Sequence, residues 1–226
     1  MVFFYKMSIA PNIRELIQAK TYEQIICNLM NESSIVFPNK YQWITEQSHG
    51  ESDFIDITNK QKYDSKILFS KEQCQLIAKG TEHLESWVAS VHKEIAEASQ
   101  KILDRKRVDI RSTMLYGELI SRLESVNYDE EAILFIPFPI VPDAQRSVFL
   151  QFASDIVSIT YDNIVNDIPE KLMGKRTYII YPSVMDQKIV LRDLTLRNKE
   201  YLPIKHISPY ITFTLEILPD DSVDNF

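Results

Sequence analysis

Glycine is scarce in this chain of 226 residues, which contains only four, and cysteine is scarcer still, with two. Four scattered glycines cannot build a phosphate-cradling loop of the NTPase or dinucleotide-binding kind, so a nucleotide hydrolase is excluded. The two cysteines, Cys27 and Cys74, lie far apart in segments of helical pattern. This spacing excludes a zinc finger and a disulfide framework, and it favours reduced thiols buried in helices.

Long apolar runs are also missing. The longest uncharged apolar run, residues 132–141, is about half the roughly 20 residues that a membrane-spanning helix needs. The start, residues 1–10, places Lys6 inside a short apolar stretch and has no small-residue cleavage site, so we expect no secretory signal. These absences predict a cytoplasmic protein that does not associate with a membrane.

The composition that remains is typical of a folded domain with an acidic surface. Hydrophobic residues make up 45% of the chain and aromatic residues 11%, which is enough apolar material for a core. The formal net charge is -7, which opposes binding to nucleic acid unless Lys and Arg gather locally or a partner protein supplies the contact.

Apolar periodicity predicts a mixed α/β domain. Helical spacing recurs over 13–30, 84–102, 112–125 and 147–165, and strand patterns occur at 35–37, 41–45, 53–57, 62–69, 131–139, 176–181, 188–192 and 210–217. The continuous apolar run in 131–139 predicts a central strand buried on both faces, and the strand–helix–strand order that follows predicts a parallel crossover. We expect a single domain over 1–226, with a helical insertion at about 71–126 and an acidic tail at 219–226.

The strands at 53–57 and 62–69 predict a β-hairpin, because the polar residues 58–61 between them have the length of a hairpin turn. A turn centred near residues 58 and 59 places Asp53 opposite Asp64, with Lys66 on the same face. A four-residue loop would instead shift the register by two and bring Glu51 nearer to Lys66. Two carboxylates beside a lysine suit Mg²⁺ or Mn²⁺ binding and phosphodiester hydrolysis.

This pattern resembles the PD-(D/E)xK nuclease superfamily, the restriction-endonuclease-like fold, in which an acidic residue precedes a D-x-K or E-x-K strand. The matching positions are Ser52-Asp53 and Asp64-Ser65-Lys66. The resemblance implies a mixed sheet with an α-β-β-β-α-β core. It further implies that Asp53 and Asp64 bind Mg²⁺ or Mn²⁺ and that Lys66 positions the attacking water.

Two features of the pattern leave alternatives open. Serine stands where the family usually has proline before Asp53, and Asp56 competes with Asp53 for the role of first acid. Some members of the family also use a glutamate from the first helix, for which Glu15 and Glu23 are both candidates.

Basic residues provide candidate contacts to a nucleic-acid backbone. They lie beside the hairpin motif and at the join between two predicted helices: Lys62, Arg105, Lys106, Arg107 and Arg111. The alternative interpretation is a solvated charged surface that complements a helix end.

The resulting hypothesis is a metal-dependent endonuclease whose expected substrate is DNA. Because the chain is acidic, we expect a helicase or ATPase partner to direct it, and the resemblance suggests bacterial anti-phage defence. The alternative is a non-catalytic subunit of a complex that docks through the long amphipathic helix at 81–104. An exposed apolar stripe on that helix, and hairpin carboxylates that do not converge, would favour this alternative.

Overall fold

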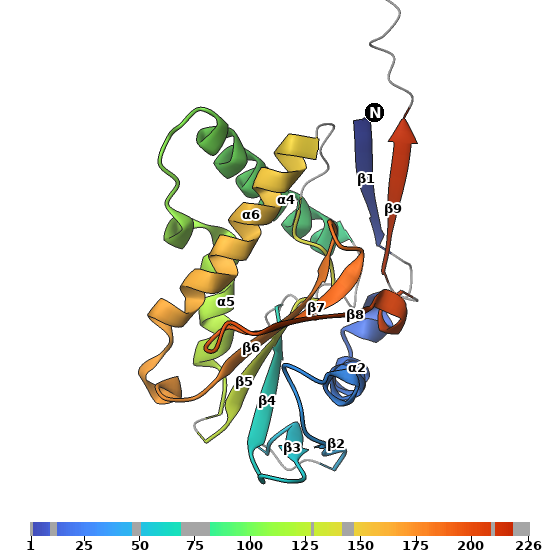
Figure 1. The fold of residues 1–226 in the computed structure, drawn as a ribbon, viewed down its shortest axis with the longest axis vertical. Helices are drawn as coiled ribbons and strands as arrows, with labels where there is room; N and C mark the ends of the chain where they lie inside the picture. The colour runs from blue at the N-terminus through green and yellow to red at the C-terminus, as the bar shows by residue number, and fades with distance from the viewer. Residues whose placement is uncertain are drawn as a thin grey trace, which may run out of the picture.

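The computed structural model describes residues 2–9, 13–46, 51–68, 82–127, 129–141, 147–208 and 211–218 (Figure 1). Within these ranges the chain forms a seven-stranded mixed sheet with helices on both of its faces, and a separate antiparallel pair. The separate pair joins β1 (Val2–Ile9) to β9 (Ile211–Leu218). The expected mixed α/β architecture is therefore confirmed.

In the described seven-stranded sheet, the strands lie side by side in the order in which they occur in the sequence. The strands are β2 (Tyr41–Trp43), β3 (Phe54–Asp56), β4 (Lys62–Ile67), β5 (Glu131–Phe135), β6 (Thr177–Ser183), β7 (Lys188–Asp193) and β8 (Lys199–Pro203). The pairs β4–β5 and β5–β6 are parallel, and all other neighbours are antiparallel. The parallel crossover predicted after residue 131 is therefore confirmed, with α6 (Ser147–Ile164) as its helix.

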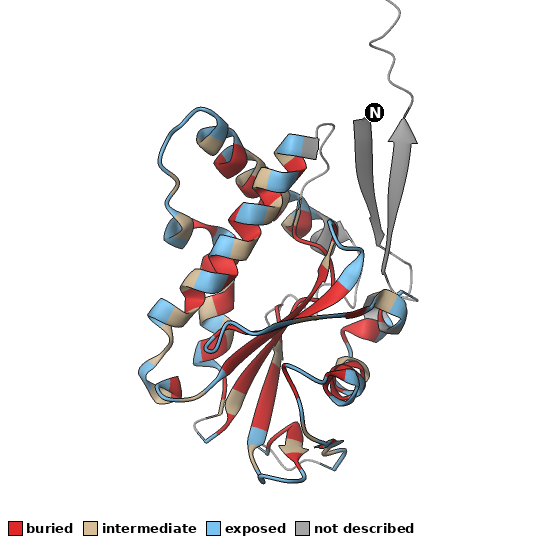
Figure 2. Cartoon of the chain, in the orientation of Figure 1, coloured by how far each residue is buried: buried red, intermediate tan, exposed pale blue. Residues whose placement is uncertain are grey.

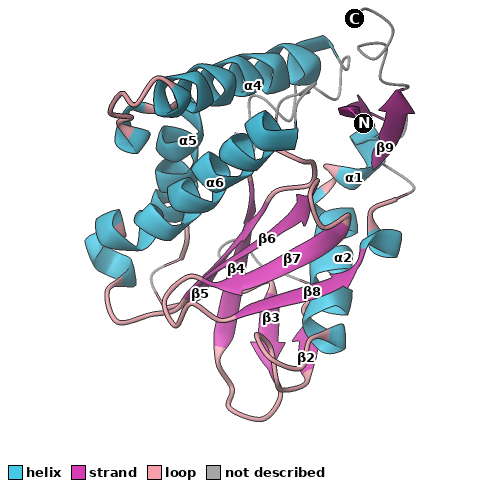
Figure 3. Cartoon of the chain, turned by 45° about the horizontal axis from the view of Figure 1, so that its top comes forward, coloured by secondary structure: helices cyan, strands magenta, loops and turns pink. Residues whose placement is uncertain are grey.

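Helices cover the sheet from two sides (Figure 3). The helices on one side are α1 (Ile13–Leu16) and α2 (Ala19–Glu32), with the short 3-10 turn Ile204–His206 beside them. The helices on the other side are α4 (Glu82–Leu103), α5 (Met114–Glu124) and α6, with short 3-10 turns at Ile110–Ser112, Val165–Asp167 and Glu170–Leu172. Tyr22 of α2 stacks on Phe135, whose neighbour in the ladder is Ile180, whereas Tyr161 of α6 contacts Tyr181. Because successive side chains of a strand alternate, these contacts place α2 and α6 on opposite faces.

Strand β5 forms the centre of the core, as its apolar run predicts. Its residues Ala132 to Phe135 are all buried, and the buried class runs through the middle strands in Figure 2. Strands buried on both faces read as continuous apolar runs because each face meets a layer of helices. The prediction of a central, doubly covered strand is confirmed.

The apolar stripe of α4 faces the interior of the molecule. Val88, Val91, Ile95 and Ala98 recur at helical spacing, and all are buried where α4 packs on α6. Trp87 contacts the ring of Phe138 edge-on at 5.9 Å. The stripe that would dock a partner in the alternative hypothesis is therefore covered by the chain's own helix.

The segment 35–37 is not a strand, although its composition predicts one. The carboxylate of Glu200 in β8 accepts hydrogen bonds from the backbone N–H groups of Ser34, Ile35 and Val36 and from the Ser33 hydroxyl, at 2.5–3.2 Å. Since consecutive N–H groups converge on one carboxylate, they cannot donate to a strand ladder. Strand β8, a five-residue segment that ends at Pro203, and strand β1 are not among the strands that the sequence predicts.

Several predictions concern residues that the structure does not describe. The acidic tail 219–226, the first part of the helical insertion at 71–81, and Cys74 all lie outside the described residues. Cys27 is buried in α2, as predicted. Across the described part of the chain, no helix combines the length and apolar character needed to cross a bilayer.

Candidate active site

The β3–β4 hairpin has the register that places the two candidate carboxylates together. Phe54 pairs with Tyr63 and Ile55 with Lys62, and the Asp53 N–H donates to the Tyr63 carbonyl oxygen at 3.0 Å. Asp53 therefore lies across from Asp64, as the turn centred near residues 58 and 59 predicts. The alternative register, from a loop over 58–61, is wrong because the loop spans residues 57–60 and is closed by the Asp56 N–H, which donates to the Gln61 carbonyl oxygen at 2.9 Å.

Asp53 is buried at the start of β3 and its carboxylate lies against the backbone of β4. Its Oδ2 accepts hydrogen bonds from both the backbone N–H and the hydroxyl of Ser65, each at 2.6 Å. The pKa of Asp53 is raised to about 6, mainly by burial and also by the charge of Asp64, while the Ser65 hydrogen bonds and the Lys66 charge lower it. The ionised form of Asp53 is therefore disfavoured by its protein surroundings.

Asp64 and Lys66 are two residues apart on β4 and so share a face. The Lys66 Nζ lies 2.8 Å from Asp64 Oδ1, and the backbone N–H of Asn127 donates to Asp64 Oδ2 at 2.9 Å. The Asp64 side chain is only 4% exposed, whereas that of Lys66 is 26% exposed. The pair therefore combines a buried carboxylate with an ammonium group that solvent can reach.

Glu23 is the first-helix glutamate that the fold brings to this site. It is buried on α2, and its Oε2 accepts a hydrogen bond from the Trp43 indole at 2.9 Å. The pKa of Glu23 is raised to about 7, mainly by burial and also by the charges of Asp53 and Asp64, while the Trp43 hydrogen bond and the Lys20 charge lower it. Glu15 is exposed on the separate helix α1, so Glu23 is the better placed of the two candidates.

Tyr22 of α2 lies close enough to these acidic residues for their charges to affect it. Burial raises its pKa well above the ordinary tyrosine value, and the charges of Asp53, Glu23 and Asp64 raise it further. The charges of Asp53, Glu23 and Asp64 therefore all act on the Tyr22 phenol. Clusters of acidic groups with raised pKa values are typical of functional sites, because structural stability alone does not favour them.

Asp56, the alternative first acid, has a structural role in the hairpin turn. Its Oδ1 accepts hydrogen bonds from the N–H groups of Thr58 and Asn59, at 2.7 and 3.1 Å. Its Oδ2 accepts from the Asn39 side-chain amide at 2.6 Å. Because its oxygens are occupied at the turn end of β3, Asp56 does not join Asp53 and Asp64.

Glu130 is a site-linked residue that sequence reasoning missed. Its carboxylate is buried, and it accepts hydrogen bonds from the Ser52 hydroxyl at 2.5 Å and the Asn127 side-chain amide at 3.2 Å. Ser52 adjoins Asp53, and Asn127 holds Asp64 through its backbone. Through Ser52 and Asn127, Glu130 is therefore linked to both Asp53 and Asp64. In the sequence, Glu130 is marked only as an acidic residue directly before an apolar strand. Its position near Ser52 depends on the parallel pairing of β4 with β5.

The predicted nucleic-acid contacts do not gather around these carboxylates. Lys62 is exposed at the start of β4, while Arg105, Lys106 and Arg107 lie exposed in the loop after α4, at the outer edge of the helical layer and away from the hairpin (Figure 1). The Arg111 side chain is paired with Asp167, with Nε and Oδ2 2.6 Å apart. A role for these residues in binding nucleic acid remains a prediction.

The donor set suits a hard divalent cation, although it is not arranged as a finished metal centre. Within the described residues, no group of three or more His, Cys, Asp or Glu side chains is arranged to hold a metal. Glu23, Asp53 and Asp64 nevertheless supply carboxylate oxygens, which Mg²⁺ and Mn²⁺ prefer. The raised pKa values of Asp53 and Glu23 identify negative charge that a cation would offset.

Comparison of the chain with protein-family models, with curated proteins and with solved structures finds no match, so the argument for a function rests on the geometry of the chain's own residues.

Proposed function

We propose that the protein is a metal-dependent nuclease of the restriction-endonuclease-like class, which hydrolyses phosphodiester bonds with DNA as its expected substrate. The observation that carries the proposal is the register of the hairpin, which places Asp53 across from Asp64 on the neighbouring strand, with the Lys66 Nζ 2.8 Å from Asp64. The approach of Glu23 from the preceding helix supports it, because charges on Asp53 and Asp64 both act on Glu23.

The order of elements supports the same class. Helix α2 is followed by the antiparallel strands β2, β3 and β4, then by α4 and α5, and then by β5 parallel to β4. This is the α-β-β-β-α-β order that the resemblance implies. The carboxylates lie on the second and third strands of that core, where the D-x-K motif is expected.

The proposed roles follow from the surroundings of each residue. Asp53 and Asp64 would hold Mg²⁺ or Mn²⁺, with Glu23 approaching Asp53 from the face of the sheet that α2 covers. The cation, when bound, would supply charge stabilisation at the phosphoryl oxygens and acidify a bound water. Lys66 is partly exposed and carries an ammonium group beside Asp64, so it can donate a hydrogen bond to a water or to a developing negative charge. Ser65 fixes the orientation of Asp53.

We further propose that a helicase or ATPase partner delivers the nucleic acid in the cytoplasm, in a setting such as anti-phage defence. The net charge of -7 and the distance of the basic loop from the carboxylates support a requirement for such a partner. The rival function, a non-catalytic docking subunit, loses one of its supporting features, because the stripe on α4 is buried against α6.

The proposal is tested by incubating the purified protein with supercoiled plasmid, linear duplex, single-stranded DNA and RNA. Each substrate is tested with Mg²⁺, with Mn²⁺ and with EDTA. We expect cleavage of at least one DNA substrate with Mg²⁺ or Mn²⁺ and none with EDTA. Cleavage that persists in EDTA, or no cleavage of any substrate by protein supplemented with its co-encoded ATPase or helicase, would contradict the proposal.

Glu130→Gln tests the support of the two carboxylates. A glutamine cannot accept from both Ser52 and Asn127 through two oxygens, so Asp53 and Asp64 lose a shared anchor. Loss of a residue that orients metal ligands typically weakens metal affinity about 10–100-fold. We expect the Mn²⁺ concentration that gives half-maximal cleavage to rise by such a factor. An unchanged Mn²⁺ requirement in a folded variant would show that Glu130 has no part in the site.

A further inference from the structure

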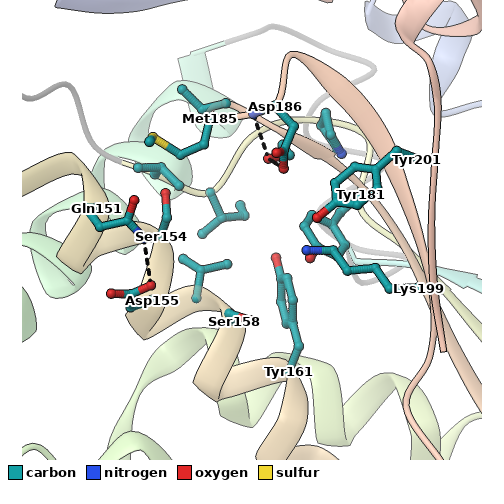
Figure 4. Close-up of a pocket in the computed structure, with 16 residues that line it drawn as sticks. Gln151, Ser154, Asp155, Ser158, Tyr161, Tyr181, Met185, Asp186, Lys199 and Tyr201 are labelled. Carbon is teal, nitrogen blue, oxygen red and sulfur yellow. Dashed lines mark hydrogen bonds between the residues drawn. The ribbon is translucent and has the colours of Figure 1, made fainter. Parts of the chain in front are cut away.

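A pocket of about 360 Å³ lies between α6 and the strands β6 and β8, apart from the carboxylates (Figure 4). Its walls come from α6, from the turn after β6, from β8, and from the segment at 140–141. Neither Asp53, Asp64 nor Lys66 lines it. The pocket is therefore a separate feature from the proposed nuclease site.

The Tyr161 hydroxyl marks the inner end of the pocket. Tyr161 is 1% exposed, and Figure 4 shows its ring rising from α6 with the hydroxyl directed into the pocket. No described residue forms a hydrogen bond with this hydroxyl. Burial raises the pKa of Tyr161 well above the ordinary value, so the group stays protonated and can donate. The hydroxyl, which opens into the pocket, is therefore available to donate a hydrogen bond to a ligand acceptor.

Two further groups from the sheet approach the same end. The ring of Tyr181 lies 4.7 Å from that of Tyr161, centroid to centroid. Lys199 extends from β8 with its ammonium group 4.6 Å over the ring of Tyr201, and within the described part of the chain it forms no ion pair. A phenolic donor and an ammonium group together suit a phosphate.

The other residues that line the pocket are either acidic hydrogen-bond acceptors or apolar. Asp186, whose carboxylate accepts from the Ser183 hydroxyl at 2.6 Å, and Asp155, which accepts from Gln151 at 2.9 Å, are acceptors available to hydroxyl or amino groups. Aliphatic side chains and the half-exposed ring of Tyr201 supply flat apolar surface. A ligand that fits has an anionic group at one end, donors at the other and a flat body between them.

We infer that this pocket binds a nucleotide, with its phosphate toward Lys199 and Tyr161 and its sugar or base toward Asp186. The volume lies in the range of small-molecule sites, about 300–1,000 Å³, so a bare phosphate would leave most of the space unfilled. The inference goes beyond the proposed nuclease activity, because it concerns residues that take no part in that site. The nucleotide is either a free molecule or one unit of a nucleic-acid strand.

The test is calorimetric titration of the wild-type protein with the four 5′-nucleoside monophosphates, with uridine, with inorganic phosphate and with a short single-stranded oligonucleotide in EDTA. We expect at least one monophosphate to bind about 10-fold or more tightly than uridine or phosphate. Tyr161→Phe removes only the hydroxyl, and Lys199→Gln only the charge. Each should weaken that binding about 5-fold or more, a factor in keeping with one lost hydrogen bond. Lys205→Gln, an exposed lysine outside the pocket, is the matched control and should bind as the wild type does.

The outcomes separate the sources of the ligand and the two proposals. Oligonucleotide binding that exceeds mononucleotide binding and weakens in Tyr161→Phe identifies a strand, whereas the reverse order identifies a free nucleotide. Absence of binding by every nucleotide probe, equal affinity for inorganic phosphate, or insensitivity to both substitutions would overturn the inference. Asp53→Asn should retain nucleotide binding, so failure of the nuclease proposal leaves this result intact.

Discussion

Asp53→Asn and Asp64→Asn are expected to lower DNA cleavage by about 100-fold or more, the loss typical of removing one electrostatic stabiliser from an active site. Both substitutions preserve side-chain shape while removing a metal-binding charge. Both carboxylates are buried, and asparagine at position 53 can still accept from Ser65 through its amide oxygen. The measurement is the initial rate of plasmid nicking with Mg²⁺ or Mn²⁺, with folding checked by circular dichroism.

The matched control is Asp56→Asn, an acidic residue of the same hairpin. Its oxygens bond the turn residues and Asn39, so asparagine loses hydrogen bonds in the turn and leaves the cleavage site unchanged. We expect lower stability, by about 1–3 kcal/mol, with full cleavage per folded molecule. Equal loss of activity in Asp56→Asn and Asp53→Asn would mean that the hairpin, rather than a specific carboxylate, supports cleavage.

Lys66→Met extends the same test to the ammonium group. The methionine keeps an unbranched side chain but removes the partner of Asp64, so cleavage should fall while the β4 strand stays paired with β5. An active Lys66→Met variant would remove the proposed role in orienting water or stabilising charge.

The hairpin motif was predictable because its geometry is local. The turn over 57–59 fixes the register of β3 on β4, and that register alone brings Asp53 opposite Asp64. Lys66 follows from strand alternation. The central strand β5 was predictable for a similar reason, because burial on both faces leaves an apolar run in the sequence.

The remaining site residues depend on contacts between distant segments. Glu23 could be separated from Glu15 only once the helix break after Leu16 had placed them on different helices. Glu130 approaches Ser52 through the parallel pairing of β4 and β5, which spans the whole helical insertion. The segment at 35–37 fails as a strand because Glu200, more than 160 residues later, takes its N–H groups. Such contacts between distant segments cannot be predicted from local sequence patterns.

In the absence of divalent metal, we expect the free energy of unfolding to decrease as the pH rises from about 5 to 7.5. Folding raises the pKa of Asp53 to about 6 and that of Glu23 to about 7, in both cases mainly through burial, so the folded state binds protons that the unfolded state has released. Stabilisation by these protons is complete below the unfolded carboxyl pKa of roughly 4 and is lost as the pH passes the folded values. Each unit of pKa displacement corresponds to about 1.4 kcal/mol, or about 3–6 °C in Tm for a domain of this size.

Bound cation should reverse this trend, because a positive charge offsets the ionised carboxylates that burial disfavours. At pH 7.5, Mg²⁺ or Mn²⁺ should therefore raise the Tm, and at pH 5.5 the same concentration should raise it less, since protons then compete for Asp53 and Glu23. Thermal unfolding followed by circular dichroism at both pH values, with EDTA and with metal, measures the effect. Asp53→Asn separates this contribution from the titration of histidines, which the variant retains. It should flatten the pH dependence and lose most of the metal-induced shift, whereas Asp56→Asn should keep both. A wild-type protein whose stability in EDTA increases steadily from pH 5.5 to 7.5, with no metal effect, would show that these carboxylates form no cation site.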